Sequence, residues 1–300
     1  MKITVLLSTY NGEKYIEQQL ESVLSQRNVE IEILVRDDDS SDSTQDILKR
    51  YQKAGKLTWY TGENCGPTFS FFDLMLKAPD SDYYAFCDQD DVWLPEKLEV
   101  ALGKLCECNI NQPALYYGCP RFVDEQLQHL DAPVGTLDFA NTVERAMICI
   151  NATGCTMVFN KALLDKVRLA TPDYLYMHDA CVHRVCLLFQ GTLFFDEAVP
   201  VMYRQHDNNV IGVNHTLAKR IQSHWKYFIS KDCGRSRLTI SLYNCYKDNM
   251  NEEERKLSEM VVHYKDNLID KMKLLLHSQM RSGSWKRDVL FRIAVILNAY

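Results

Sequence analysis

Three carboxylates follow an apolar, aromatic run and are crowded into four residues. The run is Tyr83–Cys87, and the acids are Asp88, Asp90 and Asp91. The run is typical of a buried strand, and Pro95 favours a new helix just beyond the acids, which therefore lie where the strand leaves the core. Crowded carboxylates raise each other's pKa unless a cation compensates. A hard divalent ion that also binds phosphate oxygens would do so, and the alternative is an acidic surface turn.

The composition is that of an ordinary globular protein. The 300 residues are 46% hydrophobic and 25% charged, which suits one large domain or a core domain with an appendage. Eleven scattered cysteines, an odd number, favour a reducing compartment. The chain enters a predicted strand at once, so we expect no signal peptide, and no apolar run approaches a membrane span. These features predict a cytoplasmic protein.

The charge is distributed unevenly along the chain. Residues 1–210 contain 18 Lys and Arg against 31 Asp and Glu, whereas residues 211–300 contain 16 against 9. An acidic first part and a basic last part indicate two different functions. The basic part, residues 211–300, is suited to binding an anionic surface. Nucleic acid is not an expected partner.

The first part of the chain alternates between the two periodicities of strands and helices. The predicted strands are residues 3–7, 31–35, 57–60 and 83–87, with amphipathic helices between them. Such alternation predicts right-handed crossovers and a mostly parallel sheet. The polar turns after the first, second and fourth strands then meet where such sheets bind ligands. Glycine-rich dinucleotide and P-loop motifs are absent, which argues against those enzyme classes.

The rest of the chain is less regular. Strands are predicted at 115–117, 192–195 and 199–203, a loop at 123–141, and an apolar helix from His178 to Phe189. Beyond residue 216 only helices are expected, and one of them would end near Gly283 before Ser284 caps the last. That helix would bear a single apolar stripe, made of Leu257, Val261, Tyr264, Leu268, Met272 and Leu275.

Several segments together resemble family 2 glycosyltransferases, which have the GT-A fold, and among them bacterial rhamnosyltransferases. The matching segments are Leu7–Gly12, Asp37–Thr44, Asp88–Leu98, His178–Asp179 and Tyr203–His206. Each is modest alone, but their order and spacing are specific. The resemblance implies a GT-A domain over residues 1–210, with a nucleotide-binding half at about 1–110 and an acceptor half at about 111–210. Residues 211–300 would form a basic helical extension.

The resemblance also implies roles for particular residues in donor binding. Ser8, Tyr10 and Asp38 would hold the nucleotide base, with Tyr10 stacking and Asp38 accepting the ring N3–H. Asp88 would lie near the ribose and the metal, and Asp90 would coordinate Mn²⁺ or Mg²⁺ on the diphosphate. The chain departs from the family at Asp39, where glycine is usual.

Displacing a nucleoside diphosphate from an anomeric carbon needs charge neutralisation at the leaving phosphates and a base for the incoming hydroxyl. Asp179 is the candidate base, because a helix begins at His178 on the acceptor side in similar enzymes; the alternative is an N-cap aspartate. A single base with no evident nucleophile favours direct displacement and hence inversion of configuration.

Other residues have more than one interpretation. Arg204 and His206 follow a strand in a region that closes over the diphosphate in related enzymes. His206 is a candidate third metal ligand or a hydrogen-bonded loop histidine. We expect His178 to orient a neighbour, and Gly154 to allow close approach of the acceptor or simply to form a turn. Trp93 is expected to pack beneath the acidic turn.

Three functions are compared. The first is an inverting transferase using dTDP-rhamnose, or alternatively a UDP-hexose, and a glycan or lipid-linked acceptor. The second, a nucleotidyltransferase, would need a glycine-rich phosphate loop that residues 1–20 lack. The third is a non-catalytic GT-A scaffold, which should have lost the acidic turn or Asp179.

The last predicted helix, residues 284–300, has a broad apolar face bordered by Lys286, Arg287 and Arg292. Such a helix suits the headgroup layer of an anionic membrane, so we expect peripheral membrane contact. The alternative is that the helix packs on the preceding stripe or on its copy in a homodimer.

Overall fold

The computed structural model describes residues 1–130, 139–149, 152–170, 172–206 and 233–300. The strands are β1 Lys2–Thr9, β2 Glu30–Asp37, β3 Thr58–Thr61, β4 Tyr83–Asp88, β5 Val92–Trp93, β6 Ala114–Gly118, β7 Arg121–Val123, β8 Val158–Asn160, β9 Thr192–Asp196 and β10 Val201–Arg204. The helices are α1 Ile16–Leu24, α2 Thr44–Lys53, α3 Gly66–Lys77, α4 Lys97–Leu105, α5 Val143–Ile148, the 3-10 turn η1 Gly154–Thr156, α6 Lys161–Arg168, α7 His178–Leu188, α9 Gly234–Tyr246, α10 Glu252–His263, α11 Leu268–Leu276 and α12 Trp285–Ile296.

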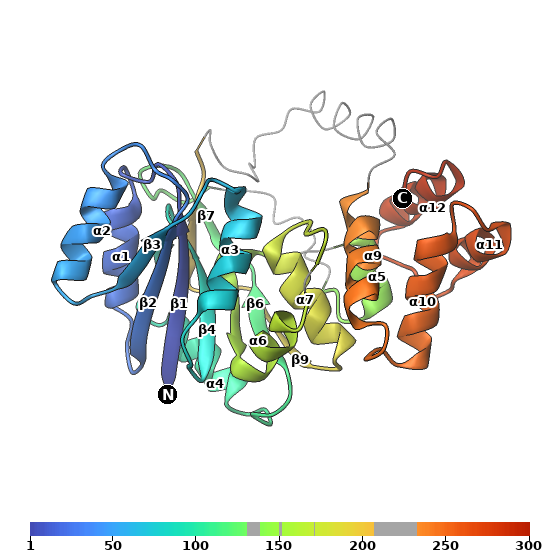
Figure 1. Cartoon of the computed structure of the whole chain (residues 1–300), viewed down its shortest axis with the longest axis horizontal. Coiled ribbons are helices and arrows are strands. Elements are labelled where there is room, and N and C mark those ends of the chain that lie inside the picture. Colours follow the sequence, from blue (N-terminus) through green and yellow to red (C-terminus); the bar gives the residue numbers. More distant parts are fainter. Residues whose placement is uncertain (131–138, 150–151, 171, 207–232) are drawn as a thin grey trace.

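A seven-stranded sheet, in the order β3-β2-β1-β4-β8-β6-β9, forms the centre of the molecule (Figure 1). All neighbouring strands are parallel except β8, which runs antiparallel to both β4 and β6. The predicted mostly parallel α/β sheet is thus confirmed. The sequence did not indicate β8, which is three residues long and lies directly before α6.

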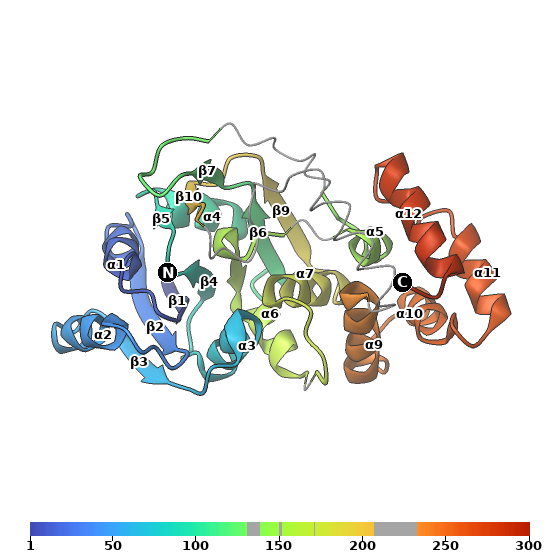
Figure 2. The same ribbon diagram turned by 90° about the horizontal axis from the view of Figure 1, so that it is seen from above.

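Both faces of the sheet are covered because β1 and β4 alternate buried side chains between them. Leu7 in β1 and Cys87 in β4 belong to one apolar cluster with α1, α2 and α4, whereas Leu6 and Phe86 belong to another with α3, α6 and α7. Figure 2 shows α4 and α3 on opposite sides of β4. Apolar packing on both faces therefore holds the carboxyl ends of the strands in place.

A second, three-stranded sheet lies beside the first. The predicted strand at 199–203 forms β10, which pairs with β5 and β7 rather than joining the main sheet. Neither β5 nor β7 was expected, since two- and three-residue strands carry no periodicity that a sequence can show. This small sheet carries the end of β10 to the turn that follows β4.

The described C-terminal helices continue the main core. Residues of α9 to α12 share one apolar cluster with α3, α5, α6 and α7, and the Tyr300 hydroxyl donates to the carbonyl of Met147 at 3.0 Å. The predicted boundary near residue 210 lies outside the described residues. None of the described helices is long and apolar enough to span a membrane.

The predicted single helix through residue 281 is wrong. It is divided into α10 and α11, because the Asn267 side chain accepts from the backbone N–H groups of Ile269 and Asp270 and so starts a new helix. Ser284 does hold the N-cap position of α12, but its side chain makes no capping bond. Instead Ser282 binds the Asp288 carboxylate through its backbone N–H and its hydroxyl.

Candidate functional site

The register of the parallel strands brings the predicted polar turns together. Ser8 at the end of β1 lies opposite Asp88 of β4, and Thr9 lies opposite Asp37 of β2. The Ser8 hydroxyl is 2.7 Å from that of Ser70 in α3. The convergence expected at the carboxyl edge is therefore present.

The side chain of Gln89 joins two of these turns. Its Oε1 accepts from the Thr9 hydroxyl at 2.6 Å and from the Tyr10 backbone N–H at 2.9 Å, and its amide donates to the Tyr10 carbonyl. The ring of Tyr10 is 48% exposed at this edge. Sequence reasoning assigned no role to Gln89, because the middle residue of an Asp-x-Asp turn carries no signal of its partner.

The acidic turn concentrates negative charge in a buried place. Asp91 is fully buried, and its Oδ2 has no hydrogen-bond partner in the described structure. Burial, together with the charges of Asp90 and Asp179, raises the pKa of Asp88 to about 7, and burial raises that of Asp91 well above its usual value. Ligand atoms of Asp88, Asp91 and Cys155 lie within 4.8 Å of one another.

These features fit a divalent cation at the acidic turn. An unpaired buried carboxylate oxygen and carboxyl groups that resist ionisation are what a missing positive charge produces. Oxygen ligands suit Mg²⁺ and Mn²⁺. Asp88 and Asp90 remain the predicted ligands; the thiol of Cys155 has a pKa raised by burial, so it stays protonated and is a poor ligand.

Beneath the turn lies a buried lysine that the sequence analysis did not single out. The ammonium of Lys97 donates to the Cys155 carbonyl at 2.8 Å and lies 3.1 Å from the centre of the Trp93 ring. Burial lowers the pKa of Lys97 to about 7, while the charges of Asp91 and Asp88 act in the opposite direction. Trp93 packs beneath the acidic turn, as expected.

Arg204 and His206 meet the turn from β10. Imidazole Nε2 of His206 is 2.7 Å from Asp90 Oδ2. Arg204 is buried and donates to the Asp90 carbonyl, to the Gln18 side chain and, through its backbone N–H, to Asp91 Oδ1. Its described bonds thus hold the acidic turn itself, and its predicted diphosphate contact stays a prediction.

An aromatic ring also holds this corner, and sequence reasoning missed it. The ring of Tyr15 stacks on that of His206 with centroids 5.3 Å apart, and the Arg204 guanidinium lies 4.7 Å from the Tyr15 centroid. Tyr15 precedes α1, whereas Arg204 and His206 lie at the end of β10, far along the chain. No local sequence pattern could therefore have indicated this contact.

Asp179 lies in the first turn of α7, buried and facing η1. Its Oδ2 accepts from the Gly154 backbone N–H at 3.2 Å and its Oδ1 from its neighbour Ala180 at 2.6 Å. Burial raises the pKa of Asp179 to about 6 against these bonds. The N-cap alternative is wrong, because Met177 holds that position.

His178 is held by packing rather than by polar contacts. Its ring stacks on Phe71 at 4.1 Å and meets Phe86 edge-on, and neither ring nitrogen has a hydrogen-bond partner in the described structure. Burial lowers its pKa to about 3, so the imidazole is neutral. The expected orienting role of His178 stays a prediction, and it would act through packing, because the ring makes no described hydrogen bond.

Gly154 has a structural reason to be glycine besides the predicted acceptor approach. A Cβ there would lie 2.6 Å from Nε2 of His178, whose ring is fixed between aromatic side chains. We expect Gly154→Ala to displace Asp179 and to cost about 1–3 kcal/mol of unfolding free energy, as overpacking does. The temperature of thermal unfolding and the transfer rate should both fall. The control is Gly103→Ala, because an added Cβ there meets no other atom within 4 Å.

Asp38, the predicted contact of the nucleotide base, is held by several bonds. Its Oδ2 accepts from the backbone N–H groups of Cys65 and Gly66, and its Oδ1 pairs with Arg36 at 2.9 Å. Asp39 has a φ of +68°, a left-handed conformation that favours glycine. The glycine that the resemblance implies at this position would therefore suit the turn, and Asp39 adopts the same conformation at a cost in strain.

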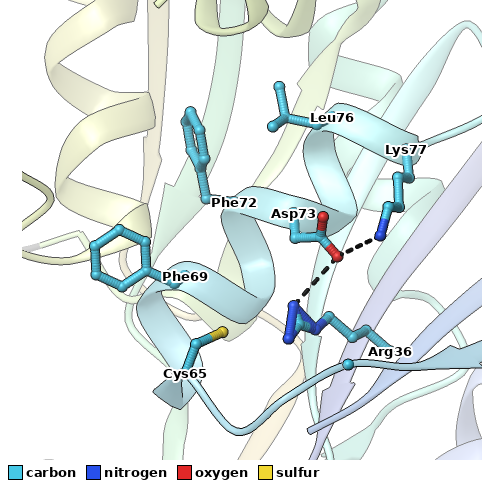
Figure 3. Close-up of a pocket in the computed structure, with 8 residues that line it drawn as sticks. Arg36, Cys65, Phe69, Phe72, Asp73, Leu76 and Lys77 are labelled. Atoms are coloured by element: carbon cyan, nitrogen blue, oxygen red, sulfur yellow. Dashed lines mark hydrogen bonds and ion pairs between the residues drawn. The ribbon is translucent and has the colours of Figure 1, made fainter. Parts of the chain in front are cut away.

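A hollow of about 360 Å³ lies on the far side of Arg36, against α3 (Figure 3). Asp73 bridges Arg36 and Lys77 across it, and Phe69, Phe72 and Leu76 line it. None of the carboxylates of the acidic turn reaches this hollow. It belongs to the surroundings of Asp38 rather than to the acidic turn.

The fold and site define an α/β protein with a carboxylate-rich turn at the carboxyl edge of a mostly parallel sheet. Residues 4–168 match the family described as Glycosyl transferase family 2. The chain belongs to that family, as predicted.

Similar proteins include the dTDP-rhamnosyl transferase RfbG of Shigella flexneri, 29% identical over 69% of this chain and 74% of that protein. The glucosyltransferase WfgD of Escherichia coli is 30% identical over 36% of this chain and 43% of its own. Among solved structures, S. aureus TarS in complex with UDP-GlcNAc is 18% identical with a TM-score of 0.61, covering 100% of this chain and 82% of that one. A Pyrobaculum calidifontis mannosyltransferase with GDP-Man and Mn²⁺ has a TM-score of 0.56 at 14% identity, covering 99% and 85%. These structures confirm the GT-A fold.

Proposed function

We propose that this family 2 glycosyltransferase moves rhamnose from dTDP-rhamnose to a hydroxyl group of a lipid-linked or polysaccharide acceptor, with inversion and with Mn²⁺ or Mg²⁺ bound. The main observation behind this proposal is that Asp179 lies near Asp88. The two are close enough for the charge of Asp179 to help raise the pKa of Asp88. The proposed base would therefore lie close to the proposed diphosphate site. The likeness to RfbG supports the sugar.

The donor would lie along the carboxyl edge of the sheet. Its base meets Tyr10 and Asp38, and its diphosphate meets the acidic turn, where Asp88, Asp90 and His206 would hold the metal. The bound metal supplies Lewis-acid neutralisation of the leaving diphosphate. Lys97 and Arg204 support the turn from beneath and from the side.

Asp179 would take the proton from the acceptor hydroxyl. The acceptor oxygen forms its bond to the anomeric carbon as the bond from that carbon to the diphosphate breaks on the opposite side. The proton stays on Asp179 and the electron pair leaves with the nucleoside diphosphate. His178 keeps the carboxylate in place by packing, and the neutral ring adds no competing charge.

One relative supports an acceptor at a membrane. WfgD acts on an undecaprenol-linked acceptor, which supports a lipid-linked glycan here and a peripheral position at the cytoplasmic face. Glycan synthesis at the cell surface is the corresponding process.

A donor screen tests this proposal. Release of nucleoside diphosphate is measured with Mn²⁺ across dTDP-rhamnose, UDP-glucose, UDP-galactose and GDP-mannose. Preference for dTDP-rhamnose is the expected result. Preference for a UDP-hexose would replace the donor but keep the class, and turnover of no nucleotide sugar with any acceptor tested would contradict the function.

A further inference from the structure

Exposed apolar side chains gather at the C-terminal end of the molecule. Ten of the seventeen large apolar residues that are exposed in the described ranges belong to α11, α12 or the residue after them. They are Leu268, Ile269, Met272, Leu276, Trp285, Val289, Leu290, Ile293, Ile296 and Leu297, here called the α11–α12 surface. A patch of this kind on a protein surface marks an interaction site.

On α11 the exposed face is the apolar one. Leu268, Met272 and Leu276 recur at every fourth position and are 72%, 46% and 74% exposed, while Leu274 on the other side is buried. Sequence analysis placed Leu268 and Met272 in one stripe with Leu257 and Val261, which are buried. The break at Asn267 turns them outward instead.

The same division holds on α12. Phe291, Ala294 and Val295 are buried, and the opposite side of the helix carries the exposed residues of the α11–α12 surface. The predicted alternative, in which this helix packs on the preceding stripe, is therefore correct for one face of α12. The other face remains exposed. Trp285, at the start of α12, is 73% exposed, and tryptophan suits the boundary between water and lipid headgroups.

Positive charge surrounds the surface. Residues 265–300 contain seven Lys and Arg and three Asp. One of the three, Asp288, is held by Ser282, and another, Asp270, lies 3.4 Å from Lys273. Lys271 and Lys273 flank the exposed face of α11, and Lys286 lies among the exposed residues of α12.

We propose that the α11–α12 surface docks on an anionic lipid membrane. An apolar face bordered by cations matches acyl chains beneath anionic headgroups. A second copy fits less well, because a two-fold interface would set the same cations against one another. In Figure 1 α11 and α12 lie at the opposite end of the long axis of the molecule from α1 and α2.

Vesicle sedimentation of the full chain tests this proposal. Phosphatidylcholine vesicles with phosphatidylglycerol should sediment the protein, and vesicles of phosphatidylcholine alone should do so much less. Leu290→Gln with Ile293→Gln and Met272→Gln should weaken binding about tenfold or more. Leu169→Gln with Ile110→Gln, at more exposed positions outside the α11–α12 surface, is the control and should bind as the wild type does.

Charge variants provide a second test that leaves packing intact. Lys271→Gln and Lys286→Gln should each weaken binding to phosphatidylglycerol vesicles about fivefold, and added salt should do the same. Equal sedimentation of wild type and apolar variant, or conversion of a dimer to a monomer without vesicle binding, would overturn the proposal. Nucleoside diphosphate release in solution should be unchanged in all variants, so a failure here is separate from a failure of the proposed reaction.

Discussion

Asp90→Asn should reduce metal-dependent transfer by roughly 10²- to 10³-fold, the effect expected when a Lewis acid worth several kcal/mol is lost. The carboxylate of Asp90 lies 2.7 Å from His206 and two residues from Asp88, so its charge is central to the proposed site. Titration of Mn²⁺ by calorimetry or electron paramagnetic resonance should show weaker binding in the variant without any donor present.

The fold of this variant should be intact and, in EDTA, at least as stable as the wild type. The Asp90 charge raises the pKa of Asp88 and of Asp91, and removing a like charge relieves that repulsion. Asp46→Asn, on an exposed carboxylate of α2, serves as the control for a generic loss of charge. Wild-type activity in the Asn variant, or full activity in EDTA, would refute the metal assignment.

Asp179→Asn should lower the transfer rate by about 10²-fold or more and leave donor and Mn²⁺ affinity nearly unchanged, because a general base contributes that much. The control is Asp165→Asn on the exposed side of α6. Loss of nucleotide affinity in the Asp179 variant would assign this residue to the donor site. A wild-type rate would place the base elsewhere.

The pH dependence should identify the same group. Burial raises the pKa of Asp179 to about 6, and only its ionised form accepts a proton. With Mn²⁺ at saturating concentration, which would keep Asp88 ionised, the wild-type rate should therefore climb with pH up to about 6 and level off above it. In Asp179→Asn this rise should be missing, which a merely structural role would not produce.

Asp179→Asn should also change the stability of the protein, in a direction that the raised pKa of Asp179 predicts. A buried carboxyl group whose pKa is raised on folding binds its proton more tightly in the folded state, so stability declines as pH rises from about 4 to about 6. At neutral pH the charged Asp179 then costs roughly 1–3 kcal/mol. Asp179→Asn should melt at a higher temperature than the wild type at pH 7, and this advantage should vanish near pH 4.

The sequence by itself determined the parts of the protein that depend on local periodicity and on motif order. The alternation of β1 and β4, the helices between them and the acids after Cys87 predicted a mostly parallel sheet with a carboxylate site at its edge. Family membership followed from the order of short segments. Each of these signals lies within a few residues, where chain geometry alone fixes which side chains share a face.

The tertiary structure alone decided which distant residues support the site. Gln89 with Tyr10, Asp38 with Gly66, and Tyr15 with His206 are pairs separated by long stretches of chain. The burial of Lys97 could not be predicted from the sequence either. Its position indicates only that a helix starts there. The partner of a polar side chain depends on how remote elements pack, and local sequence carries no record of it.

The same limit explains the outcome for the C-terminal helices. Their apolar residues were visible in the sequence, but an apolar face does not state what covers it. Asn267 starts a new helix and leaves Leu268 and Met272 exposed, while Phe291 and Val295 face the core. Helical periodicity fixes the faces of each helix, and only the packing of one helix on another decides which face meets water, lipid or protein.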